Sequence, residues 1–483
     1  MSATTETQPL NFHQRSAAVL SNPALRQSFR GAMDFLMQKR SAQFPNTEAF
    51  ESLRATGEAI RQYSLSRLPD LLEQLEKNLT ANGIQVHWAE TPEQAQTLIT
   101  DLVVAAQASL VVKGKSMVSE EIELNHALEQ RGITALESDM GEYIVQLAGE
   151  RPSHIIMPAI HKTKAEIAQL FAEKVPGVTY TDSVDELIQI GRKVLREKFK
   201  ETRVGLSGVN VAVAETGTLC LVENEGNGRM CTTVPEIHIA ITGIEKVVEK
   251  LEHVPSLMTL LTRSATGQAV TTYFNWISSP RQAGEQDGPR EVHLVLLDNG
   301  RTQAYAHPDF RATLQCIRCG ACMNHCPVYT RIGGLAYGTT YPGPIGKLIS
   351  PHLLGLSPET HSLLTASTLC GACAEVCPVK IPIPQLLIDL RAESQAIPSS
   401  EKTALSGRGA GRSLLTALSF RLWRWLYASP WRYRMLGFIA TRFRALTPSH
   451  QGAWTRYRTP LVPAARTLHE HLRKQKPPHS ASP

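Results

Sequence analysis

The sequence predicts an α/β fold that is followed by an α-helical two-cluster ferredoxin-like module and a basic helical tail. Three observations predict it: apolar and helical stretches alternate up to about residue 300, two cysteine runs follow, and arginines and tryptophans fill the end of the chain. A chain of 483 residues with 42% hydrophobic content is large enough for about two to four domains. We expect a helical segment at 1–75, the α/β domain at 76–303, the two-cluster domain at 304–395 and the basic region at 396–483.

The N-terminal segment and the α/β domain differ in their apolar pattern. Leu71, Leu72, Leu75 and Leu79 follow helical spacing, and no β-branched run interrupts residues 1–75. Beyond residue 80, strands are expected at 109–112, 154–157, 218–222, 237–241 and 292–297, and helices at 92–106, 119–130, 163–171 and 184–199. This alternation is typical of a largely parallel sheet that is covered by helices.

Seven of the nine cysteines form two runs with the same spacing. The first run is Cys316-x2-Cys319-x2-Cys322-x3-Cys326-Pro327, and the second is Cys370-Gly-Ala-Cys373-x3-Cys377-Pro378. This is the bacterial ferredoxin spacing for 4Fe–4S clusters, in which three cysteines bind one cluster and the fourth, before a proline, reaches the other. The crossed assignment gives Cys316, Cys319, Cys322 and Cys377 to cluster 1 and Cys326, Cys370 and Cys373 to cluster 2.

Cluster 2 is one cysteine short, because the position equivalent to Cys316 is Ser367. Its fourth iron therefore has a serine, a water, another residue or a partner's ligand, or the cluster has three irons. Zinc is a weaker alternative, since four-cysteine zinc sites use two separated C-x2-C pairs. Disulfides are not expected, because residues 1–8 are polar and form no secretory signal, so the protein is expected in the cytoplasm. Cys220 and Cys231, outside the runs, are interpreted as structural.

The 43 residues between Cys326 and Cys370 exceed the gap of a compact two-cluster ferredoxin. The arrangement resembles the helical two-cluster modules of succinate dehydrogenase iron–sulfur subunits and heterodisulfide reductase subunits. We expect the insert to cover a cluster from solvent. Two glycine-bearing strings, Gly343-Pro-Ile-Gly-Lys347 and Ser406-Gly-Arg-Gly-Ala-Gly-Arg412, lack the spacing or the preceding strand of a nucleotide-binding loop, and the second is interpreted as a linker.

Polar strings in the α/β domain predict a binding cleft. They are Lys113-Gly-Lys-Ser-Met117, Asp139-Met-Gly-Glu142, Pro158-Ala-Ile-His161, Ala214-Glu-Thr-Gly-Thr218, Glu223-Asn-Glu-Gly-Asn-Gly-Arg229, Ser264-Ala-Thr-Gly-Gln268, Gly284-Glu-Gln-Asp-Gly-Pro289 and Asp298-Asn-Gly-Arg301. The first suits either an anion at a helix N-terminus or a plain capped turn. His161, expected at the carboxyl end of a strand, is either a site residue or an ordinary histidine.

The tail has an unusual composition. Residues 401–483 contain 15 lysines and arginines but only Glu401 and Glu470 as acidic residues, whereas the whole chain has a net charge of +6. Four of the six tryptophans lie here among arginines, and Pro430 and Pro448 divide the tail into short helices. Such a segment suits a partner groove, the protein's own surface or a membrane interface. Nothing else indicates nucleic acid, and no apolar run approaches the roughly 20 residues of a spanning helix.

The polar strings of the α/β domain, apart from Gly284-Glu-Gln-Asp-Gly-Pro289, and both cysteine runs resemble the lactate utilisation protein B family, the iron–sulfur members of the LUD-domain family. Asp139-Met-Gly-Glu-Tyr143 and Pro152-Ser-His154 belong to the same resemblance. The match extends from about Phe12 into the tail, and the family shares the seven-cysteine pattern. The resemblance implies a LUD domain with a NagB/RpiA/CoA-transferase-like fold. It also implies a role in oxidising L-lactate to pyruvate alongside two partner proteins, and it supplies no catalytic residues.

Three functions compete on this evidence. The first is electron transfer in lactate oxidation, as a component of an L-lactate dehydrogenase complex, because two adjacent clusters form a wire. The second is acyl or CoA transfer with structural clusters and Glu223 or Glu225 as nucleophile. The third is a redox-sensing scaffold, which only the incomplete second cluster suggests. We expect two 4Fe–4S clusters and a cytoplasmic protein, with the inner membrane face as a second possible location for the tail.

Overall fold

The computed structural model describes residues 12–395, 414–452, 455 and 458–474. The chain divides into two compact units, Met1–Ala410 and Gly411–Pro483, and each is described here by itself. The predicted linker at 406–412 lies outside the described ranges. The predicted domain boundaries within the first unit stay predictions.

The described part of the first unit begins with four helices, in the region where the sequence predicts helical structure. They are α1 (Phe12–Leu20), α2 (Pro23–Gln43), α3 (Thr47–Ser66) and α4 (Leu68–Ala81). Asn22 and Asn46 cap α2 and α3, since each side chain accepts a hydrogen bond from the backbone amide of the third residue of its helix. Leu71, Leu75 and Leu79 are fully buried along one face of α4, so the helical spacing in the sequence marks the buried side.

A six-stranded parallel sheet forms the centre of the α/β region, which confirms the predicted fold class. Its order is β1 (Gln85–Ala89), β10 (Glu291–Leu297), β7 (Ile237–Gly243), β4 (Val204–Gly208), β2 (Leu110–Lys113) and β3 (Thr134–Glu137). Both faces of β10 are buried, since Leu294 and Leu296 contact the α4 side and Val295 and Leu297 the opposite side. Strands buried on both faces appear in sequence as continuous apolar runs.

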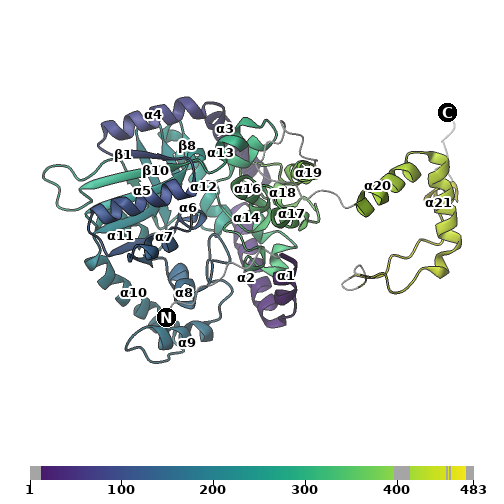
Figure 1. The fold of residues 1–483 in the computed structure, drawn as a ribbon, viewed down its shortest axis with the longest axis horizontal. Coiled ribbons are helices and arrows are strands. Elements are labelled where there is room, and N and C mark those ends of the chain that lie inside the picture. Colours follow the sequence, from purple (N-terminus) through teal and green to yellow (C-terminus); the bar gives the residue numbers. More distant parts are fainter. Residues whose placement is uncertain (1–11, 396–413, 453–454, 456–457, 475–483) are drawn as a thin grey trace. The chain divides into compact units, whose positions relative to one another are not determined.

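Helices cover both faces of this sheet (Figure 1). One face is covered by α5 (Pro92–Ala105), α6 (Met117–Glu121) and α7 (Leu124–Gln130). Part of the other face is covered by α4 and by a small sheet of order β8 (Val247–Val248), β5 (Val211–Val213), β6 (Thr218–Glu223) and β9 (Tyr273–Ile277). Near β2 the same face is covered by α8 (Met140–Ala148), α9 (Lys164–Lys174), α10 (Val184–Glu201) and α11 (Asn227–Thr233).

Two local predictions are wrong. Residues 154–157 form a loop and not a strand, because the His154 ring accepts hydrogen bonds from the amides of Ile156 and Met157 and so curls the backbone. The helix expected at 119–130 is two helices, since Glu123 between α6 and α7 has a left-handed backbone with φ of 49°.

The cysteine-bearing region consists of short helices. The helices of this region are α14 (Ala321–Asn324), α15 (Tyr329–Ile332), η4 (Leu335–Tyr337), α16 (Gly343–Leu354), α17 (Pro358–Thr365), α18 (Ala372–Glu375) and α19 (Ile383–Glu393). The last helices before it in the chain are η1 (Ile244–Lys246), η2 (Leu251–His253), α12 (Val254–Ala265), α13 (Arg301–Ala306) and η3 (Phe310–Gln315). Phe29, Met33 and Leu36 of α2 share one apolar core with Cys322, Cys326 and Cys373. The N-terminal helices therefore complete the core of the cysteine module (Figure 1).

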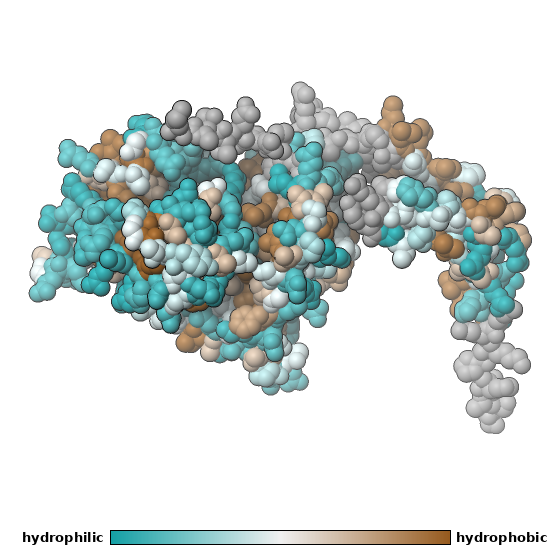
Figure 2. Space-filling model, turned by 90° about the horizontal axis from the view of Figure 1, so that it is seen from below, coloured by the Kyte–Doolittle hydropathy of each residue, from teal (hydrophilic) through white to brown (hydrophobic). Residues whose placement is uncertain are grey.

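The second unit contains α20 (Leu414–Tyr427), α21 (Pro430–Arg442), η5 (Arg444–Leu446) and α22 (Leu468–Lys474). Large apolar side chains lie exposed along it, including Trp423, Trp425 and Trp431, and hydrophobic patches interrupt its polar surface in Figure 2. Among the helices of the described ranges, none is long and apolar enough to cross a membrane.

Candidate functional site

The two cysteine runs have the same backbone conformation. Arg318 and Leu369, which precede Cys319 and Cys370, both lie in the left-handed region with φ of 61° and 56°. Gly320 and Gly371 follow with φ of 75° and 89°, and each begins a one-turn helix, α14 or α18. Non-glycine residues rarely adopt this conformation, so its occurrence at both equivalent positions shows that the sequence repeat is also a structural repeat.

Ser367 occupies the structural position that Cys316 has in the first run. The Cys316 Sγ accepts a hydrogen bond from the Arg318 amide at 3.3 Å. The Ser367 Oγ accepts the equivalent bond from the Leu369 amide at 3.2 Å. The serine hydroxyl therefore has the same local orientation as the cysteine thiol it replaces.

The first group of thiols surrounds one small cavity. Its wall includes Cys316, Cys319, Cys322 and Cys377 together with Ile345 from the insert. Burial raises the pKa of Cys319 to about 12 and that of Cys377 to about 11. The Cys377 Sγ also accepts a hydrogen bond from the Ile381 amide at 3.4 Å. Buried thiols with backbone donors to sulfur fit an iron–sulfur cluster, whose iron ions supply the charge that deprotonates them.

The second group joins Cys326, Cys370 and Cys373. Burial, together with the nearby thiols of Cys326 and Cys370, raises the pKa of Cys373 to about 11. Lys347 of α16 is buried beside this group, and within the described residues its ammonium has no carboxylate partner. It donates only to the Ala366 carbonyl. A buried lysine beside three thiols fits the binding of an anionic cluster. Cys370 is exposed, so this group is open to solvent on one side.

In the part of the chain that the structure describes, no three cysteine, histidine or acidic side chains converge as ligands of one ion. Each thiolate of a cubane cluster binds a different iron, so its sulfur atoms lie farther apart than the ligands of one zinc ion.

Arginines from the N-terminal helices reach the first group, which the sequence did not indicate. The buried Arg40 donates to the Val376 carbonyl, and Arg54 donates to the carbonyls of Cys377 and Ala374. Arg61 of α3 is also buried and donates to the Gln315 carbonyl. These cations surround the thiols with positive charge, which favours the reduced state of a cluster held there.

The predicted Asp298-Asn-Gly-Arg301 string ties the sheet to the first cysteine loop. The Arg301 Nη2 lies 2.8 Å from Glu121 Oε2, and its Nε lies 2.6 Å from Glu245 Oε2. The Glu245 Oε1 lies 3.3 Å from the Arg318 Nη2, and Arg318 stands between Cys316 and Cys319 in the sequence. Burial opposes ionisation of Glu245, but Arg301 and Arg318 lower its pKa to about 2. These linked ion pairs hold the first cysteine loop against the α/β domain.

A pocket of about 280 Å³ lies next to this loop, and four of the eight predicted polar strings contribute to its wall. Its wall includes Lys115 and Ser116, Asp139, Asn210, Glu223 to Glu225, Asn227 and Gly228, Gln268, Lys246, and Arg318 and Tyr341 of the cysteine module. Burial lowers the pKa of Lys246 to about 7, and its ammonium donates to the Cys316 carbonyl at 3.3 Å. The predicted cleft therefore borders the first group of thiols.

Several predicted site residues have structural roles instead. Burial alone would lower the pKa of Lys113, but Glu137 and Glu120 raise it, and the lysine is enclosed in this ion-pair cluster. Ser116 caps the five-residue α6, so the capped-turn interpretation holds there. His161 bonds the Ser153 hydroxyl and Glu150, each at 2.7 Å, and does not belong to the pocket wall.

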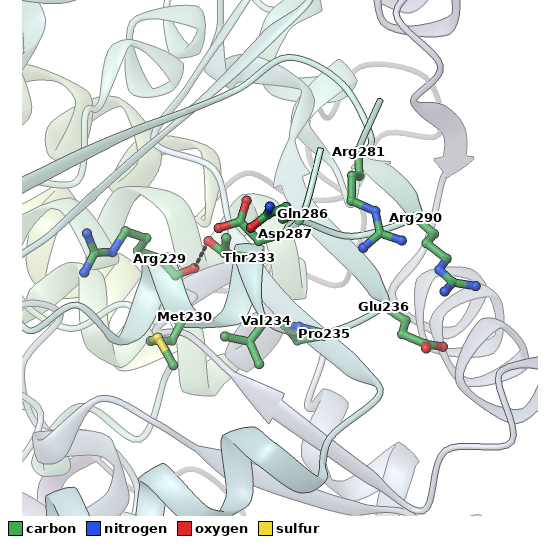
Figure 3. A pocket seen from close by; sticks show the side chains of 11 residues that line it. Arg229, Met230, Thr233, Val234, Pro235, Glu236, Arg281, Gln286, Asp287 and Arg290 are labelled. Atoms are coloured by element: carbon green, nitrogen blue, oxygen red, sulfur yellow. Dashed lines mark hydrogen bonds between the residues drawn. The ribbon is translucent and has the colours of Figure 1, made fainter. Parts of the chain in front are cut away.

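Cys220 and Cys231 are buried apolar residues, as interpreted, and burial raises the pKa of each to about 12. A larger cavity of about 560 Å³ lies where β7 and β10 begin, at the amino ends of the parallel strands. Figure 3 shows Arg229 on one side of it and Arg281 and Arg290 on the other. Ligands of parallel sheets bind outside the carboxyl ends, which favours the pocket beside the cysteines as the functional one.

Comparison with known proteins agrees with this architecture. The LUD domain family model matches residues 72–297, the 4Fe-4S dicluster domain matches 312–381, and the lactate utilisation protein B C-terminal family matches 389–477. Lactate utilization protein B from Bacillus velezensis is 43% identical, with 83% of this chain and 85% of that protein covered. The chain belongs to the lactate utilization protein B family. The resemblance read from the motifs is thereby confirmed.

Other relatives of the family show the same extent of similarity. The proteins of this name from Anoxybacillus flavithermus and Bacillus subtilis strain 168 are 43% and 42% identical, covering 85% and 84% of this chain and 88% and 85% of their own length. A solved structure of a DUF162 family protein from Deinococcus radiodurans covers 48% of this chain and 98% of its own at 16% identity. Its TM-score of 0.28 is too low to support an argument.

Proposed function

We propose that this chain is the iron–sulfur electron-transfer subunit of a system that oxidises L-lactate to pyruvate, working with two other lactate-utilisation proteins. The observation that carries the proposal is the structural repeat, which presents two equivalent cysteine loops around two separate groups of thiols. The dicluster family match and the name of the relatives support it. Iron–sulfur clusters, when bound, each accept and pass on one electron at a time.

The ligand sets that we propose are crossed. Cys316, Cys319, Cys322 and Cys377 would hold cluster 1, and this set is supported by the cavity that these four side chains line. Cys326, Cys370 and Cys373 would hold cluster 2, supported by the mutual effect of these thiols on the pKa of Cys373. We assign Ser367 Oγ to the fourth corner of cluster 2, because it repeats the backbone bond of Cys316 Sγ.

The protein's own residues set the conditions for electron transfer. Arg40, Arg54 and Arg61 place positive charge around the first thiols, and the buried Lys347 lies beside the second group. The insert contributes the apolar side chain of Ile345 to the wall of the first cavity. Cys370 is exposed, which makes the second group the natural point of exchange with a partner protein.

The acyl-transfer alternative has weaker support. Its proposed nucleophile Glu223 accepts hydrogen bonds from the Gly228 and Arg229 amides, which stabilise the carboxylate and reduce its nucleophilicity. Glu225 accepts a bond from the Met140 amide, and burial raises its pKa. Both side chains are held as loop supports.

The tail is proposed as the docking element. Its exposed tryptophans and arginines suit an acidic partner surface, and α20 presents Leu418, Leu422 and Trp425 to solvent. Peripheral contact with the inner face of the membrane is the second option, and a cytoplasmic location is proposed for the body.

The test is anaerobic optical spectroscopy of the full-length chain mixed with its two partner proteins. Addition of L-lactate should bleach the iron–sulfur absorbance, and Cys319→Ser and Cys370→Ser should each reduce the change. Pyruvate formation without any bleaching would refute the proposal.

A further inference from the structure

The pocket beside the first cysteine loop lies at the reversal point of the parallel sheet. From β2 the chain continues outward to β3, whereas from β4 it continues the other way to β7 and β10. Residues that follow β2 (Gly114 and Lys115) and residues at the end of β4 (Ser207 and Gly208) line the pocket together. Open parallel sheets bind their ligands at this position, since the loops separate there.

Among the residues that the structure describes, two lysines of the pocket wall lack a carboxylate partner, although the wall also contains Arg318 and the carboxylates of Asp139, Glu223 and Glu225. Within the described residues, neither Lys115 nor Lys246 forms an ion pair. Lys115 donates to the Ile156 carbonyl, and Lys246 donates to the Cys316 carbonyl at 3.3 Å. An ammonium group has three donors, so each lysine retains donors beyond its single carbonyl partner. Lys246 is only 7% exposed, and a buried cation is stabilised by an anionic partner.

The acidic side chains of the pocket are already engaged. Asp139 accepts bonds from the Gly141 and Glu142 amides at the start of α8. Glu223 and Glu225 accept from the backbone of α11 and of Met140. These carboxylates bond to backbone amides and, in the described part of the chain, none of them forms an ion pair with Lys115 or Lys246, so both lysines can still bind an anion that enters from solution.

The pocket volume and its neighbours narrow the class of ligand. A volume of about 280 Å³ holds a three-carbon acid with several waters, each of which needs about 30 Å³. Arg318 lies in the wall and belongs to the loop between Cys316 and Cys319. A molecule bound there would lie beside the loop that carries Cys316 and Cys319.

We propose that this pocket binds a short-chain 2-hydroxy or 2-oxo carboxylate whose carboxylate group is held by Lys115 and Lys246. The location rests on the two lysines and the sheet topology. The identity of the acid rests on the proposed function, since lactate and pyruvate are the members of this class that the pathway uses.

The experiment is anaerobic isothermal titration calorimetry of the full-length, iron-loaded chain with L-lactate and with pyruvate. Lys115→Gln keeps a donor for the Ile156 carbonyl but removes the charge, and Lys246→Gln does the same at the Cys316 carbonyl. Lys164→Gln is the control, because Lys164 is exposed on α9 and pairs with Asp182 at 2.9 Å. Iron content is measured for every variant, and Lys115→Gln decides the result if Lys246→Gln loses iron.

We expect saturable binding of at least one of the two acids, with an affinity that falls at least about tenfold in Lys115→Gln and is unchanged in Lys164→Gln. An iron-loaded wild-type chain that binds neither acid would overturn the inference, as would wild-type affinity in Lys115→Gln. Failure of the proposed function would give another result: the chain binds the acids in calorimetry, but the clusters stay oxidised when lactate and the partner proteins are added. If the clusters are reduced while the chain binds neither acid, the proposed function stands and the pocket inference falls.

Discussion

Replacing Arg301 with methionine removes the centre of the buried charge chain between the sheet and the first cysteine loop. The Arg301 guanidinium contacts Glu121 at 2.8 Å and Glu245 at 2.6 Å, and all three side chains are 2% exposed. Methionine fills a similar volume without charge, so the variant leaves two buried carboxylates without their main partner. Removing one partner of a buried ion pair costs about 3–5 kcal/mol.

We expect a cost of about 3 kcal/mol, the lower end of that range, because each carboxylate keeps another contact. Glu245 retains Arg318 at 3.3 Å, and Glu121 retains the Tyr341 hydroxyl at 2.8 Å. The control is Arg203→Met, since Arg203 pairs with Glu236 at 3.1 Å but both side chains are half exposed. Such a surface pair contributes about 0–1 kcal/mol.

The assay is anaerobic urea denaturation, followed by fluorescence and by iron release. Arg301→Met should unfold at a clearly lower urea concentration than wild type and should release iron with the transition. Arg203→Met should unfold close to wild type. Equal shifts for the two variants would refute the structural role of the buried chain.

The same network predicts a pH dependence. The folded pKa of Glu245, about 2, is lower than its ordinary value near 4.5. A depressed folded pKa contributes stability above the unfolded pKa, and that contribution is lost as pH falls from about 4.5 towards 2. Wild type should therefore lose stability over this range, and its advantage over Arg301→Met should shrink. A constant difference in urea midpoint between pH 6 and 3 would contradict this assignment.

Three further predictions concern the cysteines and the tail. Cys319→Ser and Cys370→Ser should each abolish a different EPR signal, because the crossed pattern places them on different clusters; loss of the same signal by both would disprove it. Ser367→Cys should slow the conversion of cluster 2 to a three-iron form in air, followed by the EPR signal of that form, since a thiolate then holds the fourth corner; unchanged lability would remove Ser367 from the site. Truncation after Ser406 should leave iron content intact and abolish a salt-sensitive association with the partners, measured by sedimentation; an insoluble or iron-free product would show that the tail completes the body instead.

The sheet could be predicted because its strands are local patterns. Val292 to Leu297 form an apolar run that is buried on both faces, and the same holds for β7. The loop at 154–157 was mistaken for a strand because Ile155, Ile156 and Met157 are also apolar. Its conformation depends on His154, which bonds Asn324 of α14 at 2.9 Å across the fold. No local signal predicts a contact of that kind.

The site was predictable in its cysteines but not in its surroundings. The spacing of the cysteine ligands is visible in the sequence. The hydrogen bond from Arg40 to the Val376 carbonyl joins residues more than 300 positions apart, and no local pattern predicts it. Lys113 and Lys115 look equivalent in the sequence. Pairing of β2 with β3 places Lys113 opposite Glu137 and buries it, while Lys115 lies beyond the strand and faces the pocket. Lys113 and Lys115 therefore differ in role because β3 lies beside β2, and the sequence does not show which strand pairs with β2.

Electron counting with limiting lactate tests the central claim most directly. Oxidation of one lactate to pyruvate releases two electrons and two protons, and two clusters of one chain can accept both electrons. The anaerobic chain and its partners are mixed with less lactate than chain, frozen, and examined by EPR. The account predicts up to two reduced clusters per pyruvate formed, with signals that the cysteine variants assign to this chain. Pyruvate formed in full while both clusters of this chain remain oxidised would contradict it.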